Sequence, residues 1–280
     1  MASASYGEHI FLPPEQIFPV LLEDELRERG LDVQVLNASR GGLTARSAVR
    51  DLEEVAPDWK PDVVLVYHLS NDMDGLTTGL RDASAGNDPA AVIAAERAGA
   101  QLGASGRSQS TPGGDHWPTR KALATNLYSQ AKNLVGARLA AARMLRNEVP
   151  IGLAEVFEAR LEDAIHAARN LGAEPVIVTF ATSHPVDHPS PLPAHYRRNL
   201  LRKNSVLSTH GWRTGVADWN KRLVRMAAAR EATLIDLAPA IEGRSELFTD
   251  FVHFTPKGHA KVARTLAGQL APILEQLAER

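Results

Sequence analysis

Short apolar runs alternate with helix-forming stretches along this chain, and this alternation most constrains what it can fold into. Four runs rich in Val, Ile and Leu have the length of buried strands: residues 33–36, 63–67, 176–180 and 234–237. Near-continuous apolar runs are typical of parallel strands that helices cover on both faces. We therefore predict an α/β fold, a doubly wound, flavodoxin-like parallel sheet sandwiched by helices.

Amphipathic stretches separate these runs and predict the covering helices. They lie at residues 15–29, 44–55, 151–171, 216–230 and 256–277. Gly30 is suited to end the first helix, and Pro256 to begin the last. The whole chain, residues 1–280, is interpreted as one domain.

Two segments interrupt the alternation and are interpreted as insertions at about 75–149 and 181–215. The first has a Gly-, Ser- and Pro-rich middle at 103–118, which predicts a loop between helical patterns at 89–102 and 119–145. Both insertions follow the carboxyl ends of predicted strands, where ligands bind in open α/β sheets. We expect lid or substrate-selecting elements there, with peripheral decoration as the alternative.

Composition excludes several classes of protein. The chain has 31 basic and 33 acidic residues, so it carries no electrostatic footprint for nucleic acid. It has no cysteine, which excludes disulfides, thiolate metal sites and a cysteine nucleophile. No apolar run approaches the ~18 residues of a membrane span, and there is no basic, apolar leader. Compartment and oligomeric state stay open.

Asp250 and His253 form the first candidate site, in FTDFVHFTPKGHA before the last predicted helix. A turn with this spacing can bring both side chains to the top of the sheet. A carboxylate that orients an imidazole is the arrangement of the general base in a hydrolytic triad. Because an Asp-x-x-His pair also arises by chance, a surface turn that caps the helix is the alternative.

Two further candidates follow neighbouring strands. Asn71, in YHLSNDMDG, comes after the run at 63–67, and its amide can donate a hydrogen bond to a developing oxyanion. Gly42, in NASRGGLTARS, follows the run at 33–36 and leaves its backbone N–H unshielded. Ordinary turns, at Asn-Asp and at Gly-Gly, are the alternatives.

The order of these motifs resembles the SGNH hydrolases, also called GDSL-type esterases and lipases. The resemblance covers nearly the whole chain apart from the two insertions. Ser3 and Gly7 stand at the Ser-to-Gly spacing of that family's first block. By resemblance, Ser3 is the nucleophile, Asp250 and His253 complete the triad, and the oxyanion hole comprises Ser3, Gly42 and Asn71.

The resemblance implies a serine hydrolase that cleaves a small-molecule carboxylic ester through an acyl-enzyme, with no metal and no organic cofactor. Two other functions stay open. A non-catalytic or truncated binding module would keep the pocket without a working nucleophile. An O-acyltransferase would use the same triad with an acceptor alcohol in place of water. The ester itself, whether a sugar acetate, a lipid or another acyl compound, is not specified.

Other residue patterns in the chain give weaker evidence for a functional site. His184 and His188 have a spacing that could hold a metal, but no third ligand accompanies them. His68 is interpreted as structural, and Trp212 and Trp219 as core or rim. The chain has no Gly-x-Ser-x-Gly elbow, no Walker loop and no Gly-x-Gly-x-x-Gly fingerprint, which argues against an α/β-hydrolase and against nucleotide binding.

The start of the chain, MASASYG, raises a further expectation. In the resembling family a buried strand precedes the nucleophile, whereas only Met1 and Ala2 precede Ser3. We expect a chain shortened at its amino end, with an apolar trench where that strand would lie. On this interpretation it would be poorly soluble, aggregation-prone and nearly inactive.

Overall fold

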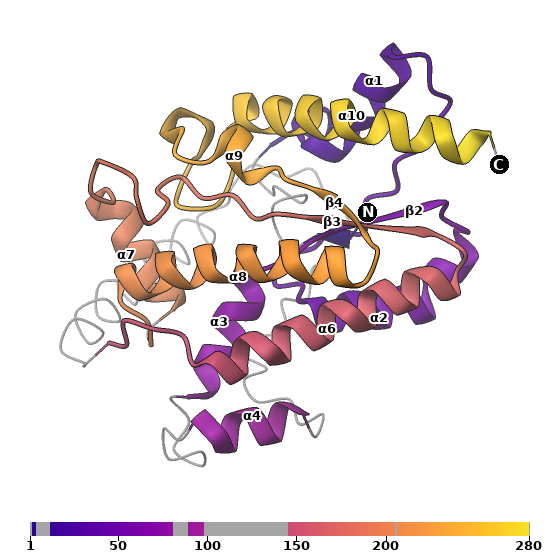
Figure 1. Ribbon diagram of the computed structural model, residues 1–280. Coiled ribbons are helices and arrows are strands. Elements are labelled where there is room, and N and C mark those ends of the chain that lie inside the picture. Colours follow the sequence, from indigo (N-terminus) through magenta and orange to yellow (C-terminus); the bar gives the residue numbers. More distant parts are fainter. Residues whose placement is uncertain (1, 4–11, 81–88, 98–144, 205, 280) are drawn as a thin grey trace, which may run out of the picture.

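A parallel sheet between two layers of helices forms the core of the protein (Figure 1). The computed structural model describes residues 2–3, 12–80, 89–97, 145–204 and 206–279. Within them the strands follow the order β1-β2-β3-β4, and every pairing is parallel. Their bounds are β1 Ala2–Ser3, β2 Val63–Tyr67, β3 Glu174–Val178 and β4 Thr233–Ile235. The α/β fold with a parallel sheet flanked by helices is confirmed.

The helices cover both faces of this sheet (Figure 1). Helices α1 and α10 pack together on one face, and α2, α6 and α8 lie on the other. The α-helices are α1 Phe18–Glu28, α2 Ala45–Glu54, α3 Ser70–Gly79, α4 Pro89–Arg97, α6 Ile151–Asn170, α7 Ala194–Lys203, α8 Thr209–Ala229, α9 Ala238–Ile241 and α10 Pro256–Ala278. Short 3-10 helices are η1 Pro14–Gln16, η2 Ala56–Asp58 and η4 Ser245–Leu247. Among the described residues, no helix combines the length and the apolar character needed to cross a membrane.

Local sequence explains where the elements begin and which face they bury. Helix α1 buries Phe18, Leu22 and Leu26, which are four residues apart and therefore lie on one side, against α10. Thr44 and Ser47 form a reciprocal capping box at the start of α2. Thr255 caps α10 by accepting a hydrogen bond from the Gly258 N–H.

One prediction about a strand is wrong. Residues 33–36 are not a strand, because no neighbouring strand pairs with them in the part of the chain described here. Side chains of α1 bind their backbone instead: Arg27 Nε donates to Val33 O at 3.1 Å, and Val35 N donates to Glu23 Oε2 at 2.6 Å. Of the opening strand, whose part ahead of Ser3 was expected to be missing, the structure describes two residues, Ala2–Ser3.

The two predicted insertions are described only in part. Residues 75–79 complete α3, and α4 packs against α6, whereas the predicted loop at 103–118 and the helical pattern at 119–144 lie outside the described residues. In the second insertion, α7 follows β3 after an irregular segment. Helix α8 begins at Thr209, seven residues before the predicted start at 216, because Ser208 caps it.

Candidate active site

The Asp250–His253 turn lies between β4 and α10. Asp250 Oδ2 is 2.7 Å from His253 Nδ1, and its Oδ1 accepts the backbone N–H groups of Val252 and His253, both at 2.8 Å. Thr249 N donates to His253 O at 2.8 Å and closes the turn. The carboxylate is thus fixed against one imidazole nitrogen, which directs Nε2 of His253 to the opposite side of the ring.

Hydrogen bonding keeps the Asp250 carboxyl ionised. Burial would raise its pKa, but the hydrogen bond and charge of His253, together with two backbone N–H groups, outweigh burial and lower the pKa below its ordinary value. An ionised carboxylate here accepts Nδ1–H and favours an imidazole whose Nε2 can take a proton. The side chains of His253 and Asp250 are 27% and 21% exposed, so the pair borders solvent.

Close packing at the start of α10 holds this turn in place. A Cβ at Gly258 would collide with the carbonyl oxygen of Leu247, so only glycine lets the helix start lie against η4. Phe248 and Phe254 pair as an antiparallel bridge on either side of the turn. Asp250 and His253 therefore lie on a short loop that is held at both ends by backbone contacts.

Asn71 and Gly42 are brought together by the residue next to Gly42. Asn71, in the first turn of α3, donates from Nδ2 to the carbonyl oxygen of Leu43 at 3.0 Å. Gly42 has φ of +79°, a conformation that L-residues rarely adopt, while a Cβ there would meet nothing within 4 Å. The backbone conformation thus selects glycine at position 42, and open space remains around it.

The buried carboxylate of Asp72, in the first turn of α3, binds the segment that follows Gly42. Both oxygens of Asp72 accept the Ala45 N–H, at 3.0 and 3.1 Å, and Arg160 Nη1 is 3.6 Å away. Burial raises the pKa of Asp72 to about 7, against the opposing effects of Arg160 and the Ala45 N–H. The contact ties the start of α2 to that of α3 and so keeps Gly42 and Asn71 as neighbours.

Lys203 reaches Asn71 from the second predicted insertion. Its Nζ donates to Asn71 Oδ1 at 3.0 Å and lies 3.5 Å from Asp74 Oδ2. Asn204 Nδ2 donates to Asp74 Oδ1 and to Thr77 Oγ1, both at 2.9 Å. Neither Lys203 nor a buried role for Asp72 was predicted, because nothing in a single sequence indicates that residue 203 meets residue 71 or that residue 72 meets residue 45.

Ser3 is placed by the pairing of its backbone. It lies opposite Tyr67, the last residue of β2, in parallel register. The Phe18 ring contacts both Tyr67 and Phe254, with centroids 6.5 Å apart in each case. Since Phe254 follows His253, this aromatic cluster links the end of β2, where Ser3 pairs, to the turn that carries His253.

His259 has a structural position behind this cluster. It is fully buried, stacks on Phe18 with ring centroids 5.9 Å apart, and its Nδ1 accepts the Phe18 N–H at 3.1 Å. The ring therefore ties the start of α1 to α10. His68 is also buried, and burial lowers its pKa to about 4.

Trp212 lies against the turn that carries His253: its ring meets that of Phe251, the residue after Asp250, edge-on with centroids 5.2 Å apart. Trp212 and Trp219 are buried, and Trp219 stacks on Phe157 at 4.6 Å, which makes both residues part of the core. The rings of His184 and His188 are 4.4 Å apart. Within the described residues, no group of three or more His, Cys, Asp or Glu could hold a metal ion.

Comparison with known proteins gives a likeness in structure only. No family model matches the chain, and no curated protein matches it in sequence. Acetylxylan esterase Axe2 from Geobacillus stearothermophilus superposes with a TM-score of 0.53 at 13% identity, over 96% of this chain and 91% of that one. The psychrotrophic esterase EstA from Pseudoalteromonas sp. gives 0.51 at 13%, over 98% and 96%.

A third similar structure carries the family name. A protein of Desulfitobacterium hafniense DCB-2, described as lipolytic and of the G-D-S-L family, gives a TM-score of 0.52 at 10% identity, over 96% of this chain and 97% of that one. At such identities the likeness concerns the fold. The predicted resemblance to SGNH hydrolases is confirmed at that level: this chain has the fold of the GDSL-type esterases and lipases.

Proposed function

We propose that the protein is a serine hydrolase that cleaves a small-molecule carboxylic ester, with Ser3 as nucleophile, His253 as general base and Asp250 as its orienting carboxylate. The observation that carries the proposal is the 2.7 Å contact between Asp250 Oδ2 and His253 Nδ1, on a braced turn of a fold that esterases share. No metal or organic cofactor takes part in this chemistry.

Acylation follows from these roles. Ser3 Oγ attacks the ester carbonyl while its proton passes to Nε2 of His253. Asp250 stabilises the imidazolium that forms, because its carboxylate already accepts from Nδ1. The tetrahedral intermediate expels the alcohol, which takes the proton from Nε2. Water then attacks the acyl-enzyme by the same route and releases the acid and Ser3.

Donors for the oxyanion are proposed at Ser3 N–H, Gly42 N–H and the Asn71 amide. An amide nitrogen carries two hydrogens, and Leu43 O accepts one from Asn71. The second can point to a substrate oxygen. Lys203 bound to Asn71 Oδ1 supports this orientation, because an ammonium group at the oxygen fixes which end of the amide donates.

Two alternatives use the same residues. An O-acyltransferase would transfer the acyl group to an alcohol in place of water, and a binding module would hold the ester without turnover. Axe2 is named as an acetylxylan esterase, which makes acetylated sugars a natural class to include in a substrate screen. Initial rates across p-nitrophenyl acyl chains and acetylated sugars, with and without acceptor alcohols, separate these alternatives.

The decisive experiment identifies the nucleophile. An active-site fluorophosphonate should label the protein once, and mass spectrometry should locate the adduct on Ser3. Ser3→Ala should lose labelling and ester turnover, whereas Ser5→Ala, a matched change two residues along the chain, should retain both. Adduct formation at another serine, or turnover by Ser3→Ala, would contradict the assignment.

A further inference from the structure

A tryptophan of α8 packs against the turn that carries the proposed general base. Trp212 is buried, and its ring meets that of Phe251 edge-on, with centroids 5.2 Å apart. Phe251 is also buried, and it lies in the chain between Asp250 and His253. Aromatic pairs favour this arrangement, which restricts how the turn can move. The position of Trp212 is therefore tied to that of the general base.

Helix α8 approaches α3 closely at the level of Trp212 (Figure 1). A Cβ on Gly215 would lie 3.1 Å from Cε of Met73, so the two helices leave little room for a side chain there. Residues three apart share one face of a helix, so Trp212 faces α3 as Gly215 does. The residue after Met73 is Asp74, a buried member of α3. The contact between the helices thus brings Trp212 to Asp74.

The polar atoms of Trp212 and Asp74 have no other use at this contact. Trp212 Nε1 and Asp74 Oδ2 are buried, and neither makes a direct hydrogen bond with another described residue. Burial raises the pKa of the Asp74 carboxyl, and the charge of Lys203, the Asn204 amide and the indole N–H of Trp212 oppose that rise. The indole N–H, which can only donate, therefore faces the carboxylate.

Asp74 continues the connection to the proposed oxyanion donor. Lys203 Nζ lies 3.5 Å from Asp74 Oδ2 and donates to Asn71 Oδ1 at 3.0 Å. Asn204 Nδ2 donates to Asp74 Oδ1 at 2.9 Å, which leaves Oδ2 for Lys203 and Trp212. One series of contacts thus joins the general base to the oxyanion donor, in the order Phe251, Trp212, Asp74, Lys203, Asn71.

We propose that Trp212 and Asp74 are positioning residues, which together hold the Asn71 amide at a fixed distance from His253. The inference rests on the proposed function, in which both groups act on the same ester carbonyl. Trp212 acts through Phe251, and Asp74 acts through Lys203. A displacement of about 1 Å between reacting groups can cost roughly 10²-fold in rate, so the connection should affect kcat rather than substrate binding.

Trp212→Phe tests the connection at its centre. It keeps an aromatic ring near Phe251 and removes the N–H that faces Asp74, so kcat per folded molecule should fall about 10-fold at unchanged KM. Trp219→Phe is the matched control. Trp219 is equally buried, lies two turns further along α8 and stacks on Phe157. It should lower the melting temperature and leave kcat unchanged. Equal losses of kcat in the two variants would overturn the proposal.

Asp74→Asn tests whether the two residues act together. Alone it should lower kcat about 10-fold at unchanged KM, but added to Trp212→Phe it should cost less than about threefold more, because both changes break one connection. Fully multiplicative losses, or a rise in KM with kcat retained, would overturn the proposal. Circular dichroism gives the folded fraction by which each rate is divided.

Nuclear magnetic resonance tests the connection without esterase activity. Asp74→Asn should shift the indole N–H signal of Trp212 and the side-chain amide signals of Asn71, while the indole N–H signal of Trp219 stays in place as an internal control. Unchanged signals at Trp212 would overturn the proposal even if ester turnover is found. Shifted signals in a chain without ester turnover would support the connection and refute the proposed function alone.

Discussion

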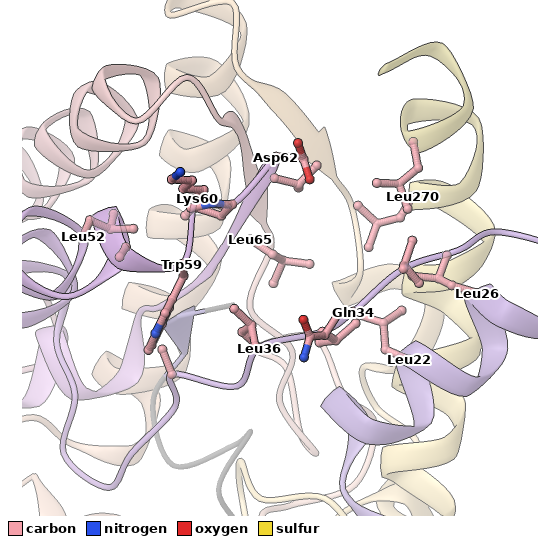
Figure 2. Close-up of a pocket in the computed structure, with 18 of the residues that line it drawn as sticks. Leu22, Leu26, Gln34, Leu36, Leu52, Trp59, Lys60, Asp62, Leu65 and Leu270 are labelled. Atoms are coloured by element: carbon pink, nitrogen blue, oxygen red, sulfur yellow. The ribbon is translucent and has the colours of Figure 1, made fainter. Parts of the chain in front are cut away.

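The two ends of β2 differ in how completely they are bonded. At the carboxyl end, Tyr67 pairs with Ser3, Asn71 binds Leu43 and Lys203, and Asp72 binds the start of α2. At the amino end, Val63 and Leu65 line a cavity of about 280 Å³ that is bordered by leucines of α1, α2 and α10 and by polar residues such as Lys60 and Asp62 (Figure 2). One strand therefore connects a polar site to an incompletely filled part of the core.

Because of this difference, we expect mutations at the two ends of β2 to affect different properties: activity at the carboxyl end and stability at the amino end. Polar groups at the carboxyl end contribute hydrogen bonds at fixed geometry, which matter most for charge that develops during a reaction. Apolar groups at the amino end contribute buried area, which matters for stability. Substitutions at the site should change activity more than melting, and substitutions in the structural clusters should do the reverse.

His253 gives the largest expected effect. His253→Ala should lower kcat/KM for an ester by ~10⁴-fold or more, since the nucleophile loses its base, with little change in melting temperature. The matched variant is His259→Ala, which removes a buried ring that binds Phe18. It should lower the melting temperature by roughly 5–10 °C and keep most activity in the folded protein. Equal activity losses in both variants would refute the comparison.

Asn71 tests the oxyanion hole. Asn71→Ala should lower kcat by ~10²–10³-fold and reduce stability by about 1–3 kcal/mol, the net worth of its hydrogen bonds with Leu43 O and Lys203 Nζ. Asn220→Ala is a suitable control, because Asn220 also binds backbone, donating to Phe180 O at 2.7 Å. It should destabilise the protein with kcat retained. Melting curves and initial rates measure both; intact kcat in Asn71→Ala would make that residue structural.

Lys203 gives a smaller effect through Asn71. Lys203→Met should lower kcat by about 10-fold at unchanged KM, because the amide loses the charged donor at Oδ1. Lys203→Arg should restore part of the rate. Lys221→Met, an exposed change on α8, should leave the kinetics unchanged. A rise in KM alone would assign Lys203 to substrate binding rather than to positioning.

Asp72 gives the smallest effect, a dependence on pH. Its pKa is about 7 in the folded protein and ~3.9 when unfolded, so the folded state binds the proton more tightly. Stability should therefore fall as pH rises from about 4 to 7. In Asp72→Asn the decline in melting temperature over that range should be shallower, whereas the exposed change Asp24→Asn should not alter it. Glu242, whose pKa burial also raises to about 7, should leave a residual slope.

Much of the architecture was predictable because local rules decide it. The run at 63–67 matches β2 at both ends, because a strand of a parallel sheet is buried on both faces and therefore consists of a short, continuous apolar run. Helices α2 and α10 begin close to where the sequence predicts, at the caps Thr44 and Thr255, whereas the cap at Ser208 was not recognised and α8 begins earlier than predicted. The run at 33–36 has the same composition yet is not a strand, because a strand also needs a partner of correct register.

Some residues of the candidate site were likewise predictable from local sequence, and others were not. Asp250 and His253 are three residues apart, so one turn suffices to join them and the sequence predicts their contact. Gly42 and Asn71 were predicted only as strand-end residues, and their connection through Leu43 depends on the packing of α2 against the sheet. Lys203 could not be predicted, since its contact spans 132 residues of sequence.

The sequence by itself determined the alternation of strands and helices, the Asp-x-x-His turn and the glycine at position 42, because each depends on interactions within a few residues. Tertiary structure alone decided that Lys203 reaches Asn71, that Asp72 is buried against Ala45, and that His259 supports Phe18. It also decided that an apolar groove lies beside Val63, because a cavity exists only where distant segments fail to meet.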